Sequence, residues 1–338
     1  MKNIYEIAKM AGVSKSTVSR VLNNNGYVSQ EVRDKVNKVV EETGYTPSVV
    51  ARSLSRQETN IIGVVIPEMA NHFFAEVLSG ISEVCDQMGW SMICCDTGND
   101  VVKEDRALRV LAQQRVRGLI LTPAAERNLK ERRVLETLFD DLEVPIVLLD
   151  RHLNKSRWGG VFYENKKSGY LATKELIQAG SETVGIITGD LKLQIARERY
   201  QGFLMAMEEA GKPIDEAYVF VGDFSVETSY KLTKKMIAAG NMPDSIITSN
   251  NLTSLGFLKA MREEKKRIGR DIAVIGIDSI DILDILDYSF SCVARDTNEM
   301  GKTAMRLLQE LTDKKAVDNV VYTVPCVLQL KGSERRSP

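Results

Sequence analysis

Side chains that build catalytic and metal sites are scarce or unsuitably spaced in this 338-residue sequence. The five cysteines are odd in number and none lies in a C-x-x-C pair, which argues against a disulfide framework and a zinc site. Only two histidines are present, and no G-x-S-x-G motif accompanies them. No G-x-G-x-x-G fingerprint of a dinucleotide enzyme occurs. We therefore expect neither enzyme activity nor a cofactor.

Long apolar runs are also missing. No stretch of 18 apolar residues occurs, so the sequence predicts no transmembrane helix. The opening residues MKNIYEIAKMAG lack the apolar core of a secretory signal. We expect a protein of the reducing cytoplasm that has no membrane partner.

Two stretches look like ligand-binding motifs but lack a necessary feature. Gly301-Lys302-Thr303 would end a phosphate-binding loop only if glycine stood at Asp296, so we interpret it as the start of a helix. The aspartates of DSIDILDILD recur every three residues, which is not the spacing of a calcium loop. The Ile and Leu between them predict a packed helix face. We expect no bound metal.

Charge divides the chain unevenly. Residues 1–56 contain nine Lys and Arg against five Asp and Glu, whereas the remainder contains 36 against 41. A basic module on an acidic body is typical of a nucleic-acid contact joined to another function. A chance fluctuation in a short window would look the same on charge alone.

Apolar periodicity predicts three short helices in this basic part. The apolar faces end at Gly12, at the turn 23–26 and at Gly44. The link AGVS between the first two helices is the short glycine-containing turn of a helix-turn-helix. Three helices sharing one small core are therefore expected.

The second predicted helix turns its apolar residues inward, so its polar residues cover the outside. Short hydroxyls and long cations there can hydrogen-bond phosphates and base edges in a major groove. A polar outer face is also what any surface helix shows. The candidate DNA-binding residues are Lys15, Ser16, Thr17, Ser19 and Arg20.

The segment TPSVVARSLSRQETN follows and carries apolar residues beside cations. Ala51 and Leu54 are two of its apolar positions, and Arg52 is one of its cations. So short a helix is not stable alone in water. We expect this segment to become helical only when docked, which makes it a candidate hinge and adds Ala51, Arg52 and Leu54 to the DNA-binding candidates.

Three segments of the sequence together resemble a known family: IYEIAKMAGVSKSTVSRVLNNNGYVSQEVRDKV, GYTPSVVARSL and IIGVVIPEMANHFFAEVLSGI. In order and spacing they are similar to the bacterial lactose-repressor/galactose-repressor family of transcription regulators. The resemblance implies that Lys15, Ser16 and Arg20 face base edges, with Ser14, Thr17 and Ser19 nearer the backbone. It also implies that Leu54 wedges into the central minor groove.

The rest of the chain alternates apolar strands with amphipathic helices. Strands are predicted at 61–67, 91–97, 118–123, 145–150, 184–189, 245–250 and 273–278. Such alternation indicates an α/β doubly wound chain, and its length indicates two units with a cleft. The region resembles periplasmic sugar-binding proteins. The predicted fold is a small all-α helix-turn-helix head plus an α/β body of two doubly wound subdomains of periplasmic-binding-protein type.

Ligands of such folds bind at the carboxyl ends of strands. Three predicted strands end in polar residues, and aromatic rings and a cation occur nearby; a sugar needs acceptors, donors and a ring face. Phe at a helix start can equally belong to the core. The resemblance implies effector contact for Arg199, Asn250 and Asp278. The effector-binding candidates are Phe73, Phe74, Asp150, Arg199, Phe224, Asn250 and Asp278.

Departures from the family pattern bear on the ligand more than on the fold. They fall at Asn250-Asn251, Gly180-Ser181, Glu164-Asn165 and Arg295-Asp296. We expect the local hydrogen bonds, and the contacts where the subdomains join, to differ from those of other members.

The sequence thus predicts a head at 1–46, a hinge at 47–60, a body at 61–332 and a tail at 333–338. A transcriptional regulator, expected to be a repressor, explains all parts together. Its partners would be a pseudo-palindromic double-stranded operator, a sugar-like effector and a second copy in a homodimer. A purine or other metabolite as co-repressor is the alternative effector. A solute-binding protein or a cleft enzyme would explain the body alone.

Overall fold

The computed structural model describes residues 2–23, 26–45, 59–124, 133, 135–138, 144–153, 157–314 and 319–336. The chain divides into two compact units, Met1–Thr59, which contains the predicted head, and Asn60–Pro338, which contains the predicted body.

Three helices form the head: α1 (Ile4–Ala11), α2 (Lys15–Asn23) and α3 (Gln30–Thr43). At the start of α1 the Asn3 side chain accepts from the backbone N–H of Glu6, and the Glu6 carboxylate accepts from the N–H of Asn3. The helix ends at Gly12, whose φ of 68° lies in the left-handed region that glycine adopts readily. This cap lets the chain turn into α2, and the predicted helix-turn-helix is confirmed.

The core of the head is small. Its buried residues are Ile7, Ala8, Val18, Val21 and Val36. All come from the apolar faces that the periodicity predicts, so the three helices hold one another through a few aliphatic contacts. No helix of the described residues, in head or body, is long and apolar enough to cross a membrane.

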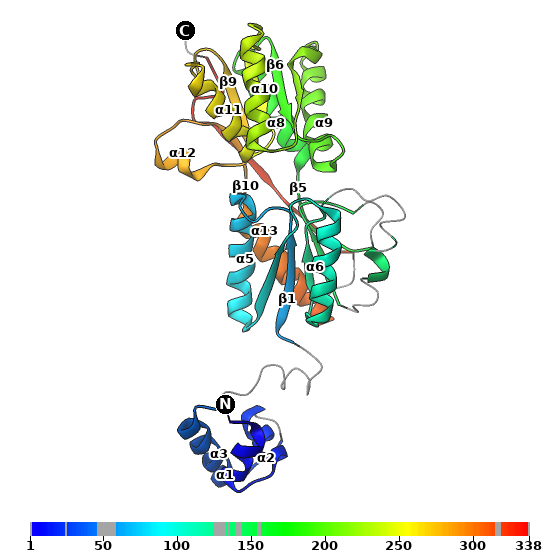
Figure 1. Ribbon diagram of the computed structural model, residues 1–338. Helices are drawn as coiled ribbons and strands as arrows, with labels where there is room; N and C mark the ends of the chain where they lie inside the picture. Colours follow the sequence, from blue (N-terminus) through cyan, green and yellow to red (C-terminus); the bar gives the residue numbers. More distant parts are fainter. Residues whose placement is uncertain are drawn as a thin grey trace. The chain divides into compact units, whose positions relative to one another are not determined.

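The body contains two six-stranded sheets, each with helices on both faces (Figure 1). The first subdomain has the order β11-β5-β4-β3-β1-β2, with strands Val321–Val324, Gly160–Tyr163, Ile146–Leu149, Leu119–Leu121, Ile61–Ile66 and Ser91–Asp96. The second has the order β12-β10-β9-β8-β6-β7, with strands Cys326–Gln329, Cys292–Arg295, Ala273–Ile277, Ser245–Thr248, Val184–Thr188 and Val219–Val221. Among these strands the β10–β12 pair is antiparallel and the other pairs are parallel. The predicted α/β doubly wound body is confirmed.

Helices cover both faces because parallel strands are apolar on both sides. In the first subdomain α5 (His72–Met88) and α13 (Thr297–Thr312) pack on one face and α6 (Val101–Gln113) on the other. In the second, α8 (Asn165–Gln178) and α9 (Gln194–Glu209) oppose α10 (Val226–Ala238) and α11 (Asn251–Glu263). The 3₁₀ helix Glu216–Tyr218 precedes β7, and the short α12 (Asp281–Ile285) follows β9.

Glycine explains how closely α5 and α13 approach. A Cβ on Gly80 would lie 2.1 Å from the carbonyl oxygen of Asn298, and one on Gly301 would lie 2.1 Å from that of Val77. Only glycine fits at these two positions. Gly301 therefore serves helix packing. Residues 301–303 are helical as predicted, but the helix begins at Thr297, four residues before the predicted start.

The chain crosses between the subdomains three times. It passes from β5 to α8 at Glu164, from β10 to α13 at Asp296 and from β11 to β12 at Pro325. Three short neighbouring crossings can absorb rotation without disturbing either sheet. These three crossings lie beside the space between the subdomains.

All seven predicted strands are present, within one or two residues at each end. The sequence interpretation missed β5, β7, β10, β11 and β12, which are short or lie at crossings and edges. The predicted packed face after Asp278 is only partly present. Ile280 and Leu283 pack against the core of the second subdomain, whereas Ile282, Ile285 and Leu286 are 51%, 76% and 68% exposed.

Candidate functional site

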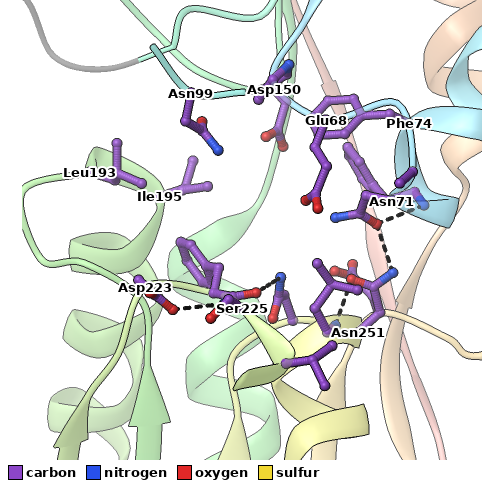
Figure 2. A pocket seen from close by; sticks show the side chains of 18 of the residues that line it. Glu68, Asn71, Phe74, Asn99, Asp150, Leu193, Ile195, Asp223, Ser225 and Asn251 are labelled. Atoms are coloured by element: carbon purple, nitrogen blue, oxygen red, sulfur yellow. Dashed lines mark hydrogen bonds between the residues drawn. The ribbon is translucent and has the colours of Figure 1, made fainter. Parts of the chain in front are cut away.

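A cavity of about 600 Å³ lies between the two subdomains. Figure 2 shows side chains from both subdomains pointing into it. The seven effector-binding candidates all line it: Phe73, Phe74, Asp150, Arg199, Phe224, Asn250 and Asp278. Their contact with a ligand stays a prediction, but the structure brings all seven to one place.

The topology explains why distant residues meet here. Asp150 follows β4, Asn250 follows β8 and Asp278 follows β9, so each stands at the carboxyl end of a parallel strand. Phe73 and Phe74 lie in the first turn of α5, and their rings meet edge to face with centroids 4.8 Å apart. Polar strand ends and aromatic rings therefore surround the same space.

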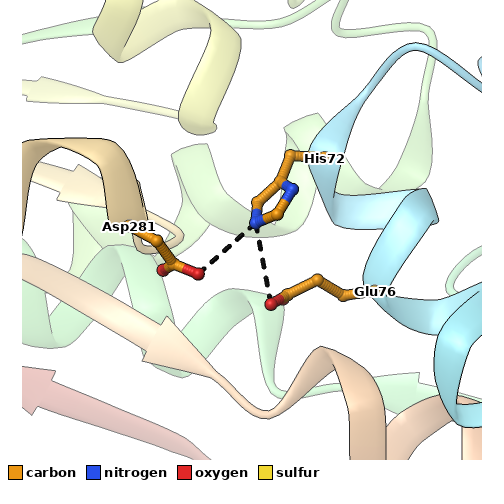
Figure 3. A group of neighbouring side chains, drawn as sticks. All are labelled: His72, Glu76 and Asp281. Atoms are coloured by element: carbon orange, nitrogen blue, oxygen red, sulfur yellow. Dashed lines mark hydrogen bonds and ion pairs between the residues drawn. The ribbon is translucent and has the colours of Figure 1, made fainter. Parts of the chain in front are cut away.

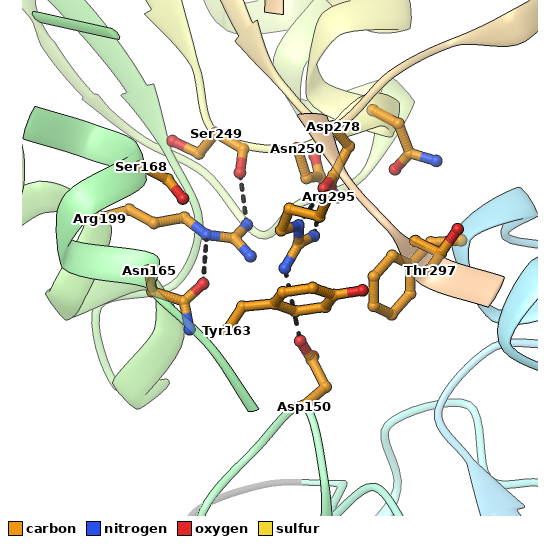
Figure 4. Close-up of polar contacts among 12 residues, drawn as sticks. Asp150, Tyr163, Asn165, Ser168, Arg199, Ser249, Asn250, Asp278, Arg295 and Thr297 are labelled. Carbon is orange, nitrogen blue, oxygen red and sulfur yellow. Dashed lines mark hydrogen bonds and ion pairs between the residues drawn. The ribbon is translucent and has the colours of Figure 1, made fainter. Parts of the chain in front are cut away.

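Arg199 is a fixed, buried donor on α9, only 2% exposed. Its Nε donates to Oδ1 of Asn165 at 2.9 Å, and its Nη1 donates to the carbonyl of Ser249 at 2.5 Å (Figure 4). Its guanidinium carbon lies 5.6 Å from the centroid of the Phe224 ring. Burial lowers the pKa of Arg199 to about 10, so the group stays charged at neutral pH.

Arg295 joins the two subdomains through charge. Its guanidinium donates to the carboxylate of Asp278 in the second subdomain, and its Nη1 lies 3.6 Å from Oδ1 of Asp150 in the first (Figure 4). The rings of Phe73 and Tyr163 flank it, with centroids 4.8 and 4.3 Å from its central carbon. Burial alone would lower the pKa of Arg295, but the two carboxylates outweigh burial and raise it.

Two buried polar atoms in this network have no hydrogen-bond partner: Nη1 of Arg295 and Oδ1 of Asp150. A buried polar atom without a partner costs roughly 1–3 kcal/mol. The pair is one donor and one acceptor that a ligand hydroxyl can satisfy together.

Backbone strain collects around the cavity. Asp150, Phe224 and Asp278 have φ of 61°, 68° and 74°, in the left-handed region that side chains rarely adopt. Asp tolerates it better than Phe. The Phe224 ring also occupies the space of a Cβ on Gly189, which would lie 2.3 Å from the ring. Strained conformations of this kind cluster at functional sites.

Asn250 and Asn251 make structural hydrogen bonds at the start of α11. The Asn250 side chain accepts from the N–H of Thr253 at 2.8 Å, as a helix cap does, and donates to the carbonyl of Phe224 at 3.3 Å. Asn251 donates to Oδ1 of Asn71 at 2.9 Å and so connects the second subdomain to the first. The Asn-Asn departure from the family pattern thus lies in the cavity wall.

The sequence interpretation missed several lining residues. Arg151 donates to Oδ1 of Asn99 at 2.7 Å and to two backbone carbonyls, so it secures the wall. The available signal was that Arg151 follows Asp150 directly and that Asn71 lies two residues before Phe73. The polar lining residues not predicted are Glu68, Asn71, Asn99, Arg151, Asp223, Ser225, Glu227, Asn251 and Arg295.

The second helix of the head presents the polar surface that the sequence predicts. Lys15, Ser16 and Arg20 are exposed. Lys15 Nζ donates to the Tyr5 hydroxyl at 3.1 Å and lies 4.6 Å from that ring's centroid. α1 therefore steadies the cation at the leading end of α2.

Ser14 and Thr17 are less free to contact a partner. Ser14 Oγ accepts from the N–H of Thr17 at 3.1 Å and lies 2.8 Å from the Thr17 hydroxyl. These bonds make Ser14 the cap of α2. Ser19 is half-buried. The DNA-binding candidates Ala51, Arg52 and Leu54 lie outside the described residues.

Family comparisons agree with both units. Residues 3–48 match the family described as bacterial regulatory proteins, lacI family, and residues 173–333 match a periplasmic binding protein-like domain.

Similar proteins span nearly the whole chain. The HTH-type transcriptional repressor PurR of Photobacterium profundum is 31% identical over 333 residues, covering 98% of each chain. The ribose operon repressor of Halalkalibacterium halodurans is 33% identical over 336 residues, 99% of this chain and 98% of the other. A solved Lac repressor dimer, bound to operator and the anti-inducer ONPF, has a TM-score of 0.86 at 26% identity, over 98% of this chain and 99% of that one.

Proposed function

Because the chain belongs to the lacI family of bacterial regulatory proteins, we propose that it represses transcription from an operator and that a neutral sugar in its cavity controls this binding. The similar proteins are named as repressors, and none of their names denotes an enzyme. Such a protein acts where the chromosome lies, in the bacterial cytoplasm.

The head supports operator binding by its exposed polar helix. Lys15, Ser16 and Arg20 can reach base edges when α2 lies in the major groove, and cations elsewhere in the head can contact phosphates. In a homodimer two such helices would read a pseudo-palindromic site about one helical turn apart.

The observation that carries the sugar proposal is the chemistry of the cavity wall. Five carboxylates line it, those of Glu68, Asp150, Asp223, Glu227 and Asp278. Ionised carboxylates only accept hydrogen bonds, so a ligand that donates hydrogen bonds fits this wall. Part of this capacity is already used, because Asp278 accepts from Arg295 and Asp223 accepts from Ser225 and Thr228. A polyol has a hydroxyl on nearly every carbon.

The wall also explains why we prefer a neutral sugar to the alternatives. Three guanidinium groups, of Arg151, Arg199 and Arg295, face the five carboxylates, so a phosphate would add repulsion. A purine offers few N–H donors for so many acceptors. The three phenylalanine rings supply apolar faces for the C–H side of a sugar. A purine co-repressor nevertheless fits the name PurR, which several relatives carry, and is tested below.

The three crossings between the subdomains are the expected link from the cavity to the head. A ligand that contacts both subdomains favours one rotation about the three crossings, and its coupling to DNA equals its differential affinity, typically about 1–3 kcal/mol. We propose that residues 47–60 transmit this rotation, with Leu54 entering the minor groove and Ala51 and Arg52 beside it. The direction of the effect, induction or co-repression, is open.

The short helix α12 offers the surface that we propose for contact with a second copy. Ile282, Ile285, Leu286 and Tyr288 are 51%, 76%, 68% and 42% exposed, an apolar group that a partner would cover. Ile285→Asp should shift the protein toward monomer in sedimentation, whereas Val102→Asp, 76% exposed on α6, should not. Equal sedimentation of both variants and the parent would exclude this surface.

The function is tested with the full-length protein in two steps. Thermal shift with neutral pentoses and hexoses, sugar phosphates and purines should find stabilisation by a neutral sugar, about 2.7 kcal/mol at 100 times its Kd. Gel shift with genomic fragments should then find a fragment whose retardation changes with that sugar. Asp150→Asn should remove the thermal shift, and Asp86→Asn on the exposed side of α5 should not.

Three outcomes would contradict the proposal. Stabilisation by a purine alone would establish the alternative effector. Stabilisation by a sugar phosphate above the parent sugar would show that the charge argument is wrong. Equal binding to all fragments would show that the head has no operator.

A further inference from the structure

Three side chains capable of binding a metal meet where the subdomains face each other outside the cavity. His72 and Glu76 lie one turn apart on α5 of the first subdomain, and Asp281 begins α12 of the second. One ligand atom of each lies within 4.8 Å of the others (Figure 3). We propose that these three residues bind a divalent transition-metal ion, Zn²⁺, that bridges the two subdomains.

Two of the three distances between the ligand atoms match those of a metal site. His72 Nε2 lies 3.4 Å from Oδ2 of Asp281 and 3.6 Å from Oε1 of Glu76. A charged hydrogen bond between such groups is shorter, about 2.7–2.9 Å. A tetrahedral zinc site with bonds of about 2.0–2.2 Å places its ligand atoms about 3.3–3.6 Å apart.

The chemistry of the three groups selects the metal. An imidazole nitrogen suits zinc, nickel and copper, whereas calcium and magnesium prefer all-oxygen sites. Two carboxylates neutralise the charge of the ion. The side chains of His72 and Asp281 are 58% and 55% exposed, so ions reach the site from solvent and water can complete the coordination.

A fourth residue orients the carboxylate of Glu76. Thr297 Oγ1 donates to Oε2 of Glu76, which leaves Oε1 turned toward His72. Hydrogen bonds of this kind to ligating carboxylates are typical of metal sites. A cavity of about 10 Å³, lined by His72, Glu76 and Thr297 among others, adjoins the group and has room for one water-sized particle.

The position of the site links it to the effector cavity. Phe73, Asn251, Asp278 and Arg295 line both spaces. An ion held by α5 and α12 together favours one arrangement of the subdomains, so its binding and that of a cavity ligand must influence each other equally. The proposal of a zinc site does not depend on which ligand the cavity binds.

The test is titration of the full-length protein with ZnCl₂ alone, by calorimetry in a buffer that does not chelate zinc. We expect one ion per chain with a micromolar Kd. His72→Gln and Asp281→Asn should each weaken it at least tenfold, while Asp287→Asn, an exposed carboxylate just after α12, should leave it unchanged. Co²⁺ should give the visible absorption of a tetrahedral site in the parent and lose it in both ligand variants.

Circular dichroism of each variant separates loss of a ligand from loss of fold. A folded Asp281→Asn or His72→Gln protein that binds zinc as the parent does would overturn the proposal. Absence of binding to the parent up to 100 µM would overturn it as well.

Discussion

Helix α2 of the head and the cavity of the body both present polar and charged side chains but bury them to different degrees. Lys15, Ser16 and Arg20 are exposed and lie within six consecutive residues. Asp150 and Asp278 are 4% and 6% exposed and stand 128 residues apart. An exposed group needs no internal partner, whereas a buried charge must find one within the fold. Changes in the head surface should therefore alter binding alone, and changes in the cavity should alter binding and stability together.

The largest expected effect is unfolding of the head while the body stays folded. Ile7 is 0% exposed in the small core of the head, and Ile7→Ala should cost about 2–5 kcal/mol. That is comparable to the whole stability of a small domain, so the head should unfold and operator binding should be lost. Circular dichroism melting and gel shift measure this.

The matched control is Met10→Ala, which is 49% exposed on the same helix and should change little. The body should keep its melting temperature and effector affinity. If the body transition fell together with that of the head, the two units would not be independent.

The next effect tests the buried charges of the cavity. Asp278→Asn leaves Arg295 with only the Asp150 carboxylate at 3.6 Å, and should destabilise the body by about 3 kcal/mol. Asn tolerates the left-handed backbone at this position, so the loss reports on charge. Urea denaturation measures the stability, and calorimetry should show loss of the effector. The variant should still bind the operator in the absence of effector. An effector affinity equal to that of the parent would show that Asp278 does not contact the effector.

A smaller effect, on operator binding alone, is expected from the exposed residues of α2. Arg20→Ala should cost about 1–3 kcal/mol of operator binding and relax one base position, with no change in melting temperature. Lys38→Ala on α3, whose side chain is 77% exposed, should change specific and random DNA binding alike. Equal losses on operator and random DNA for Arg20→Ala would show that Arg20 contacts only phosphate.

The smallest expected effect is on how the stability of the body depends on pH, through the buried carboxylate of Glu334. Burial raises the pKa of Glu334, but hydrogen bonds from Ser291 and from the N–H of Gly332 outweigh it and hold the pKa below its ordinary value of 4.5. Stability from this group is therefore present above pH 4.5 and lost as pH falls through the lower folded pKa. Glu334→Gln should cost about 1–2 kcal/mol at pH 7, and the difference should shrink below about pH 4.

Urea denaturation of the body at pH 7 and at decreasing pH down to about pH 3 measures this difference. The carboxylates of the described head are all exposed, so the head should show no comparable change. A constant difference between Glu334→Gln and the parent across this range would contradict the assignment.

The sequence by itself determined the helices of the head, because Ile7, Val18 and Val36 recur at helical spacing within a short stretch. It also determined the parallel strands and the polar residues at their ends, because buried strands read as apolar runs that stop abruptly. Asp150 and Asp278 were found in this way, and the family resemblance added Arg199.

Only the tertiary structure decided which polar groups pair across the body. Arg295 meets Asp150 because the chain crosses between the subdomains three times, and a crossing has no periodicity to read. His72 meets Asp281 across 209 residues, whereas along the chain Asp281 belongs to a row of aspartates that predicted no metal. Local spacing encodes helices and strands, but the partners of a buried or bridging charge are set by how two sheets face each other, which no short stretch of sequence contains.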